Sequence, residues 1–248
     1  MNCSDKFKNW TIEYKNIVDS TMNEIQKDIY KSYSNIAILS SEQIKGRGRG
    51  QNEWVSEKGN FYASIKTKTS LSNKHFIVSY VIGIIMYDVI EKYINEKNRI
   101  IIKWPNDILV DRKKIAGILI EMNTFGNKVE DIVVGIGLNI KSCPIVKKYE
   151  TTCLHRESNI KTDVKIIIKQ ILNCYDKWKK YLSTETNNIQ FIIDQWMNRS
   201  FAVGTVVRIK KDNKLVKGIY EGIDLDGSIK IMLDNKVKKF NNLDTVYI

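Results

Sequence analysis

Apolar residues follow two different periods along the chain, and these periods separate predicted strands from predicted helices. Short segments rich in Ile and Val, bounded by polar residues, are typical of strands within a sheet. The predicted strands before Arg199 are Thr11–Val18, Ile36–Ser40, Phe61–Lys66, Arg99–Lys103, Asp107–Val110, Ile115–Glu121 and Ile132–Leu138. The turn Asp111–Lys113 suits a hairpin between two of them.

Apolar residues three to four positions apart predict helices between these strands. One helix begins near Ser20, because Thr21 and Glu24 have the spacing of a capping box. Its apolar stripe continues through Ile25, Ile29 and Tyr33. The other predicted helices are Ser72–Glu91, Asp163–Leu182 and Asn188–Asn198.

After Arg199 the helical spacing stops, and short strands alternate with Asp-Asn and Asp-Gly turns. The predicted strands are Val206–Lys210, Leu215–Gly222, Ser228–Leu233 and Lys236–Phe240. A segment this short has room for little beyond a small barrel. Between Asn123 and Asp131 the chain reads as an ordinary hairpin turn around Gly126.

The composition is that of an ordinary globular protein, with 248 residues of which 43% are hydrophobic and 27% charged. Met1–Trp10 lacks the apolar stretch of a signal peptide. Ser79 and Asp88 interrupt the longest apolar run, Ile77–Ile90. This run is shorter than the ~20 residues that cross a bilayer, so we expect a cytoplasmic protein without a membrane partner.

The net charge of +12 raises the question of a nucleic-acid partner. Most of the basic residues are lysines spread along the whole chain, and they accompany many Asn and Ile residues and only 2 Pro. This bias is also typical of an AT-rich genome, so a dispersed, solvated surface is the favoured interpretation. Phe240 and Tyr247 are too sparse for a platform on which bases stack.

The cysteines and histidines show no metal-binding or disulfide pattern. Cys3, Cys143, Cys153 and Cys174 include no Cys-x-x-Cys, and neither His75 nor His155 has a plausible ligand beside it. Four reduced thiols are therefore expected.

The segment Gln43–Trp54 carries the strongest chemical signal. Glycines alternate with Arg47 and Arg49, which combines a backbone that can approach a ligand closely with two fork-shaped cations. Guanidinium groups bind phosphate and carboxylate, and Trp54 adds a flat surface for a base. The sequence predicts an anion-binding loop over a nucleotide. Because its arginines repel each other without an anion, we expect the Gly46–Asn52 part to be mobile until ligand binds.

Three further motifs lie at predicted strand ends. Lys103–Asp107 places Asn106 and Asp107 after a proline, and an amide beside a carboxylate suits Mg²⁺ on nucleotide phosphates. Lys114–Gly117 combines a lysine with a glycine where a ligand could lie on the backbone. Gly135–Asn139 repeats this device and ends in an amide that could read a base.

Together these motifs resemble the biotin–protein ligase (biotin–[acetyl-CoA-carboxylase] ligase) family, in order and in spacing, and Asp19–Thr21 agrees with the Ser-Thr of its biotin site. The resemblance implies an α+β fold, with a mixed β-sheet flanked by helices as in class II aminoacyl-tRNA synthetases. It implies a catalytic domain over residues 1–199 and an SH3-like C-terminal domain over residues 200–248.

The resemblance also implies a reaction. Biotin would attack magnesium ATP to give biotinyl-5′-AMP, and a lysine of a biotin carboxyl carrier protein or domain would then take the biotinyl group. A helix-turn-helix module of the bifunctional members is not seen, so a monofunctional enzyme without a DNA partner is expected. A homodimer, the identity of the carboxylases and the affinities are left open.

The motif residues take roles from this resemblance. The catalytic residues would be Arg47, Arg49 and Lys114. The biotin-binding residues would be Ser20, Thr21, Met22, Gln43, Arg47, Gly48, Arg49, Lys114, Gly117 and Gly137. The nucleotide-binding residues would be Arg47, Arg49, Trp54, Asn106 and Asn139, and the Mg²⁺ ligands Asp107 and Asn106.

Several of these residues have a purely structural alternative. Ser20 and Thr21 could only cap a helix, Asp107 could be a turn residue, Trp54 could pack in the core, and Asn139 could cap a strand. Whether Lys103 faces the site is left open. Met22, Gln51 and Asn52 depart from the family pattern, which leaves the role of the later loop residues open.

Three other functions compete with this interpretation. A lipoate–protein ligase would share the fold and the adenylation chemistry, but it is expected to show a different glycine signature with a nearby His. A basic nucleic-acid-binding module would use the terminal barrel. A ligand sensor without catalysis would not need Lys114 and Asp107.

Overall fold

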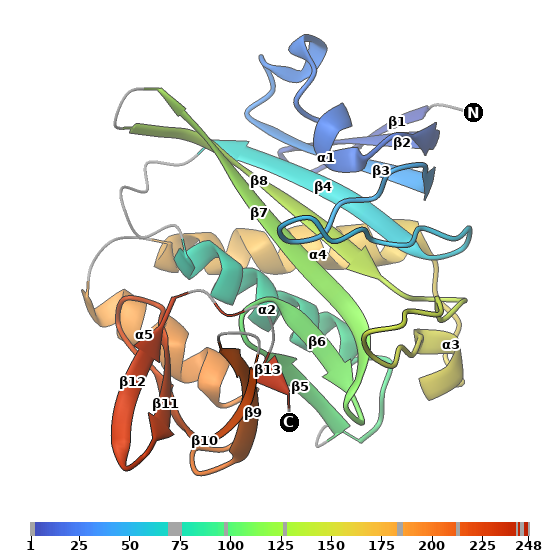
Figure 1. The fold of residues 1–248 in the computed structure, drawn as a ribbon. Helices are drawn as coiled ribbons and strands as arrows, with labels where there is room; N and C mark the ends of the chain where they lie inside the picture. Colours follow the sequence, from blue (N-terminus) through green and yellow to red (C-terminus); the bar gives the residue numbers. More distant parts are fainter. Residues whose placement is uncertain are drawn as a thin grey trace.

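The computed structural model describes residues 3–68, 76–96, 99–125, 128–182, 186–211, 214–241, 243 and 246–247. The predicted residues His75 and Gly126, and the start of the predicted helix at Ser72, lie outside this description. Figure 1 shows a large twisted sheet, helices against it and a smaller sheet built by the end of the chain.

The large sheet is mixed, as predicted. Its strands are β1 (Cys3–Phe7), β2 (Trp10–Val18), β3 (Asn35–Gln43), β4 (Phe61–Lys68), β5 (Ile100–Lys103), β6 (Asp107–Val110), β7 (Lys113–Phe125) and β8 (Lys128–Leu138). They lie in the order β1-β2-β3-β4-β8-β7-β6-β5, with β2 and β3 parallel and every other neighbouring pair antiparallel. The predicted hairpin at Asp111 is confirmed, with positive φ values of 46° at Asp111 and 65° at Arg112.

The helices are α1 (Thr21–Glu24), α2 (Phe76–Ile90), α3 (Leu154–Glu157), α4 (Val164–Trp178) and α5 (Thr186–Met197), with 3-10 turns η1 (Asp28–Tyr30) and η3 (Lys179–Tyr181). Figure 1 shows α2 and α4 behind the large sheet, whereas α1 and the loop after β3 lie on its other face. The apolar α2 is buried nearly all round because the sheet, α4 and α5 all pack against it.

The predicted first helix is shorter than its apolar stripe suggested. The Gln26 and Lys27 amides bond carbonyls three residues back, so the chain tightens and leaves α-helical geometry after Glu24. Ile29, which the stripe placed on the buried face, is 67% exposed. Three short elements, β1, α3 and the last strand β13 (Val246–Tyr247), have no counterpart among the predicted ones.

The end of the chain forms a five-stranded antiparallel sheet in the order β12-β11-β10-β9-β13. Its strands, besides β13, are β9 (Val206–Lys211), β10 (Lys214–Ile223), β11 (Ile229–Leu233) and β12 (Lys236–Phe240). The second sheet packs against the helices beside the large sheet: the Tyr80 hydroxyl on α2 donates to the Gly227 carbonyl at 2.6 Å.

Candidate active site

A buried polar cluster lies at the start of α1. The Ser20 Oγ accepts from the Met22 amide at 3.2 Å, so Ser20 caps the helix, which was its structural alternative to binding biotin. The Gln43 Oε1 on β3 accepts from the Thr21 amide at 2.8 Å and from the Thr21 hydroxyl at 3.1 Å. The Ser64 hydroxyl on β4 donates to Thr21 at 2.9 Å. Three predicted biotin contacts therefore lie side by side, with Ser64 as an additional member.

The loop after β3 folds back on itself. The Trp54 amide donates to the Gly46 carbonyl at 2.9 Å, and the Gly48 amide donates to the Asn52 carbonyl at 2.8 Å. A Cβ on Gly46 would lie 2.2 Å from the Trp54 carbonyl oxygen, so only glycine fits there. The loop thus forms a narrow strap whose two limbs are bonded to each other.

The Trp54 indole lies directly on the sheet. A Cβ on Gly137 would lie 2.3 Å from the Trp54 ring, and one on Gly117 would lie 2.7 Å from it. The two glycines were predicted to admit a ligand to the sheet, but in this structure they admit the indole. The next glycine of β8, Gly135, is covered in the same way by Met22, whose Sδ would be 2.7 Å from a Cβ there. Met22 is thus part of a core contact here.

Two lysines share one carboxylate beside this indole. The Lys114 Nζ lies 2.7 Å from Asp107 Oδ1, and the Lys103 Nζ lies 3.7 Å from Asp107 Oδ2. The three side chains are each only about 15% exposed, and burial lowers the pKa of the Lys103 ammonium. Lys103, whose orientation the sequence left open, therefore lies in one cluster with Lys114 and Asp107. The Lys114 ammonium also lies 5.1 Å from the Trp54 ring centre and 5.0 Å from that of Tyr149.

The predicted magnesium ligands do not fit a cation in this arrangement. Both carboxylate oxygens of Asp107 face ammonium groups, which would repel a divalent ion. The Asn106 amide donates to the Ile118 carbonyl at 2.6 Å and so fastens the strand exit to β7. Among the residues that the structure describes, no three His, Cys, Asp or Glu side chains are grouped to hold a metal ion.

Asn139 lies at the end of β8 in a small cavity. Its side chain is buried, its Nδ2 donates to the Thr152 carbonyl at 2.9 Å, and its Oδ1 has no hydrogen-bond partner. The Trp54 Nε1 in the same cavity also lacks a partner. The cavity is lined by Trp54, Val55, Lys114, Asn139, Pro144, Val146, Tyr149 and Thr151. It thus offers one free buried acceptor and one free buried donor to a ligand.

The loop arginines point to different partners. Arg47 pairs with Glu121 on β7 and donates to Asn23 Oδ1 at 2.9 Å. Arg49 donates to the Leu243 carbonyl near the end of the chain at 3.1 Å and lies 5.9 Å from the Trp104 ring centre. These partners relieve the repulsion between the two arginines, which was the reason for expecting a mobile loop. Contacts of either arginine with phosphate stay a prediction.

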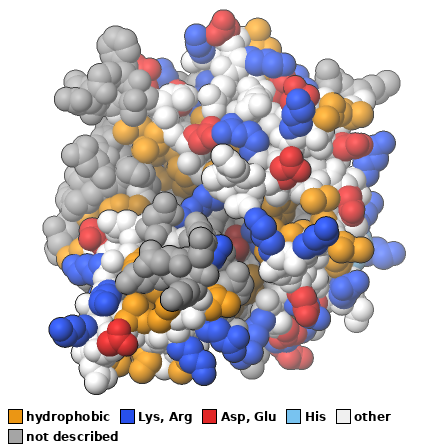
Figure 2. Space-filling view, in the orientation of Figure 1, with side chains coloured by type: hydrophobic (Ala, Val, Ile, Leu, Met, Phe, Trp, Pro, Cys, Tyr) orange, Lys and Arg blue, Asp and Glu red, His pale blue; other side chains and the backbone are white. Residues whose placement is uncertain are grey.

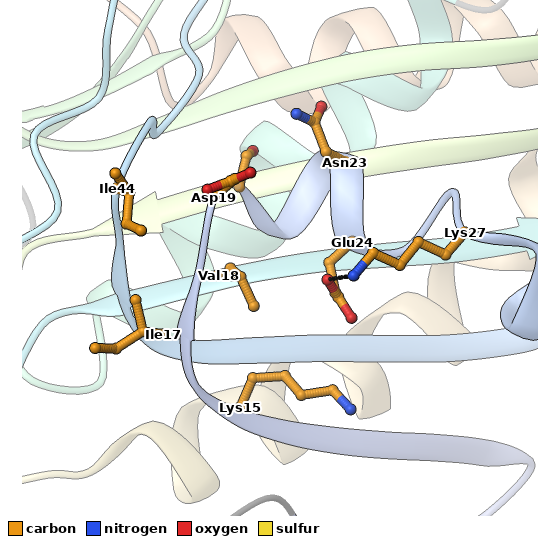
Figure 3. Close-up of a pocket in the computed structure, with 9 residues that line it drawn as sticks. Lys15, Ile17, Val18, Asp19, Asn23, Glu24, Lys27 and Ile44 are labelled. Carbon is orange, nitrogen blue, oxygen red and sulfur yellow. Dashed lines mark ion pairs between the residues drawn. The ribbon is translucent and has the colours of Figure 1, made fainter.

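A cavity of about 400 Å³ lies beside α1, next to the polar cluster at the start of this helix (Figure 3). It is lined by Lys15, Ile17, Val18, Asp19, Ser20, Asn23, Glu24, Lys27 and Ile44. The Glu24 carboxylate and the Lys27 ammonium pair within it at 2.6 Å. Of the predicted site residues it contains Ser20 alone, so it borders the polar cluster without enclosing it.

Surface charge and thiols bear on two earlier expectations. Figure 2 shows Lys and Arg interspersed with Asp and Glu over the visible face, as expected for a dispersed solvated charge. All four cysteines are free, as expected, although the Sγ atoms of Cys143 and Cys153 lie only 2.8 Å apart. No described helix is long and apolar enough to cross a membrane.

Besides Ser64, sequence reasoning passed over two groups that this geometry brings in. Glu121 could have been found, because it follows Gly117 by an even number of positions on one strand and so shares its face. Asn60 accepts at Oδ1 from the amides of Ile140, Lys141 and Ser142 and so holds the chain after Asn139. No sequence pattern marks this role of Asn60.

The candidate site combines a glycine-arginine loop, a buried polar cluster and two lysines on one carboxylate. Residues 14–139 match the sequence model of the biotin/lipoate A/B protein ligase family, about half of the chain, and the chain belongs to that family.

Curated relatives agree with this membership. The biotin–[acetyl-CoA-carboxylase] ligase of Paracoccus denitrificans is 28% identical over 77% of this chain and 82% of its own length. The bifunctional ligase/repressor of Bacillus spizizenii is 28% identical over 93% of this chain and 72% of its own.

A solved structure supports the fold. The biotin protein ligase from Aquifex aeolicus in complex with biotin and ATP superposes with a TM-score of 0.76 over 95% of this chain and 97% of that one, at 23% identity. The predicted fold class, a mixed sheet with helices and a small C-terminal β-domain, is confirmed.

Proposed function

We propose that this protein is a biotin–protein ligase, which joins biotin and ATP to form biotinyl-5′-AMP and then transfers the biotinyl group to a lysine of a biotin carboxyl carrier domain. One observation carries the proposal: segments that are distant in the sequence meet on one face of the large sheet. They bring a polar cluster at Thr21 and Gln43, a glycine floor at Gly117 and Gly137, and the paired lysines. Family membership supports the same reaction class.

The polar cluster suits the ureido head of biotin. This group carries two N–H donors and one carbonyl acceptor, and Ser20, Thr21 and Gln43 provide hydroxyl and amide groups of both kinds. These side chains are held by bonds to Ser64 and Ser56, the latter 2.9 Å from the Gln43 Nε2. A site built from such fixed polar groups rejects analogues that leave them unpaired.

The lysines suit the meeting of two anions. Biotin carboxylate and the α-phosphate repel each other, so adenylation needs positive charge held where they approach. Lys103 and Lys114 provide two ammonium groups on one carboxylate, and Asp107 fixes their positions. Arg49, which now contacts Leu243 and Trp104, would add a third cation from the loop, and Asn139 and Trp54 would bind the adenine.

Magnesium enters this reaction as the usual partner of the ATP phosphates. No residue of this chain is assigned to it, because Asp107 is engaged by both lysines. The second half-reaction needs no metal-bound group: the lysine amine of the carrier attacks the mixed anhydride, and AMP leaves.

Exchange of labelled pyrophosphate into ATP tests the proposal directly. We expect exchange that depends on biotin and is absent with lipoate, and biotinylation of a purified carrier domain on addition of biotin and ATP. Exchange supported by lipoate instead of biotin would assign the chain to the other activity of its family. No exchange with either acid would refute the adenylation chemistry.

A further inference from the structure

The guanidinium of Arg47 joins three elements of the fold. Its Nη2 pairs with Glu121 Oε1 on β7, and its Nη1 donates to Asn23 Oδ1 on α1 at 2.9 Å. The Gln26 Nε2 donates to the other Glu121 oxygen at 2.9 Å. One carboxylate therefore holds the loop arginine and is itself held in place. Figure 3 shows Asn23 directed away from the Glu24–Lys27 pair, which leaves its amide to the loop.

This contact lies at the far end of the site from the lysines. Gly117 and Glu121 share one face of β7, and four residues of strand span about 13 Å. The Lys114 Nζ would lie 3.3 Å from a Cβ on Gly117, so the lysine cluster is at the Gly117 end. The partners of Arg47 instead lie toward α1, which begins with the polar cluster proposed for the ureido head.

Holding Arg47 also holds the strap. The two limbs of the loop are bonded between Gly46 and Trp54, and Arg47 forms a β-bridge with Glu53. Because the limbs move together, a side-chain anchor at Arg47 fixes the whole segment against β7 and α1. A Cβ on Gly46 would lie 2.2 Å from the Trp54 carbonyl oxygen, so the two limbs approach each other closely at this point.

We propose that Glu121 is a positioning residue, which closes the Gly46–Trp54 strap over the biotin end of the site by holding Arg47. The identity of the ligand rests on the proposed function, whereas the closure itself concerns the empty protein. Arg47 then acts through its position on the strap and not as a ligand of the phosphates. Arg47 as an anchor of the strap and Arg47 as a ligand of the phosphates predict different behaviour for Glu121→Gln.

Ligand dissociation separates the two roles. Labelled biotin, chased with excess unlabelled biotin, should leave Glu121→Gln about fivefold faster than the parent, the upper range for a partly exposed ion pair. The KM for biotin should rise by a similar factor, with kcat for pyrophosphate exchange within about twofold. Arg47→Gln should show the same faster dissociation, and the double variant no further increase, because both remove one pair.

Salt gives a readout that general loosening would not reproduce. Added NaCl should speed biotin release from the parent by screening the pair, and it should change the release from Glu121→Gln much less. Asp88→Asn is the matched control, since it breaks the partly exposed Asp88–Arg199 pair at 2.9 Å, which joins α2 to the chain after α5 and includes no residue of the strap. It should leave biotin dissociation and its salt dependence at the parental values.

Hydrogen exchange tests the closure without any ligand. In the empty protein, the amides of Gly48 and Trp54 should exchange faster in Glu121→Gln than in the parent or in Asp88→Asn. Unchanged protection of these amides would overturn the proposal. So would unchanged biotin release in Glu121→Gln combined with a raised KM for ATP in Arg47→Gln. A parent that fails to bind biotin would refute the proposed function. The hydrogen-exchange experiment on the empty protein would still decide whether Glu121 holds the strap closed.

Discussion

Two unpaired polar atoms lie close together at the end of β8, where we propose that the adenine binds. Buried oxygen and nitrogen atoms without partners cost free energy, so folded proteins retain few of them without a reason. The Asn139 Oδ1 and the Trp54 Nε1 are both unpaired within one small cavity. Adenine presents an amine donor and ring acceptors along one edge, which matches this pair.

Asn139→Leu should therefore weaken the use of ATP. Loss of one buried acceptor for the adenine amine should raise the KM for ATP about tenfold, with little change in biotin binding. The discriminating measurement is the ratio of the KM values for GTP and ATP, which should fall toward one. A partial loss of folding would lower the active fraction and leave that ratio unchanged.

Lys66 on β4 is a buried cation outside the proposed reaction. It is 4% exposed, its ammonium donates to the Tyr30 carbonyl, and burial lowers its pKa below the ordinary value near 10.5. Between the lowered folded pKa and the unfolded value, the unfolded chain binds more protons. The stability contributed by this group therefore rises with pH across that interval and is constant below it.

Lys66→Met removes this dependence. The free energy of unfolding of the variant, relative to that of the parent, should be highest at neutral pH. This difference should shrink as the pH approaches 10.5. Urea unfolding of both proteins between pH 7 and 10.5 measures the difference, in which the tyrosine titrations that they share cancel. A difference independent of pH would mean that the pKa of Lys66 is not lowered in the folded protein.

At the scale of the elements, the strap and the two central strands form one packed unit. The glycines of β7 and β8 accept the Trp54 indole, and the strap closes above it through the Gly46–Trp54 bond. The sheet backbone cannot move away from an added methyl group, because its strands are bonded on both sides. Added volume must therefore displace the indole.

Gly137→Ala tests this packing. The Cβ would lie 2.3 Å from the Trp54 ring, so we expect a loss of about 1–3 kcal/mol in the free energy of unfolding. In a Trp54→Ala background the same substitution should cost far less, because the clash is gone. Equal costs in both backgrounds, measured by denaturant unfolding, would show that the indole does not rest on Gly137.

At the scale of the whole molecule, the two sheets share one hydrophobic core. The ring centres of Tyr80 on α2 and Trp196 on α5 are 5.2 Å apart, and those of Phe201 and Tyr220 on β10 are 4.5 Å apart. Buried residues of both sheets belong to one connected cluster, whereas Ile36, Ile38 and Val133 of the large sheet belong to a second cluster with Met22 and Ile25. The predicted division at residue 199 stays a prediction, and this core makes independent unfolding of the two parts costly.

We expect a single cooperative unfolding transition. Tyrosine and tryptophan fluorescence and far-ultraviolet circular dichroism should give coincident midpoints in urea. Tyr80→Phe removes the bond to the Gly227 carbonyl and should lower the unfolding free energy by about 1 kcal/mol without splitting the transition. Two resolved transitions would show that the terminal sheet unfolds by itself.

Sequence patterns predicted the large elements well because burial and strand alternation are local signals. The strands at Asp107 and Lys236 have the predicted bounds, and the fold class is confirmed. The helix at Ser20 was overestimated, since its stripe continues to Ile29, which the fold leaves in solvent. β1 was missed because it is an edge strand of mixed polarity, with Lys6 and Asp5 among its five residues.

The sequence by itself determined which chemical groups are present and on which elements they lie: a glycine-arginine loop, lysines at strand ends and a capped helix start. These follow from covalent order and local conformational preference. Only the tertiary structure decided their partners, because contacts between distant segments depend on how the strands are paired. In the structure, Lys103 and Lys114 both contact Asp107. The Trp54 indole lies on Gly117 and Gly137, and Glu121 is the counter-ion of Arg47.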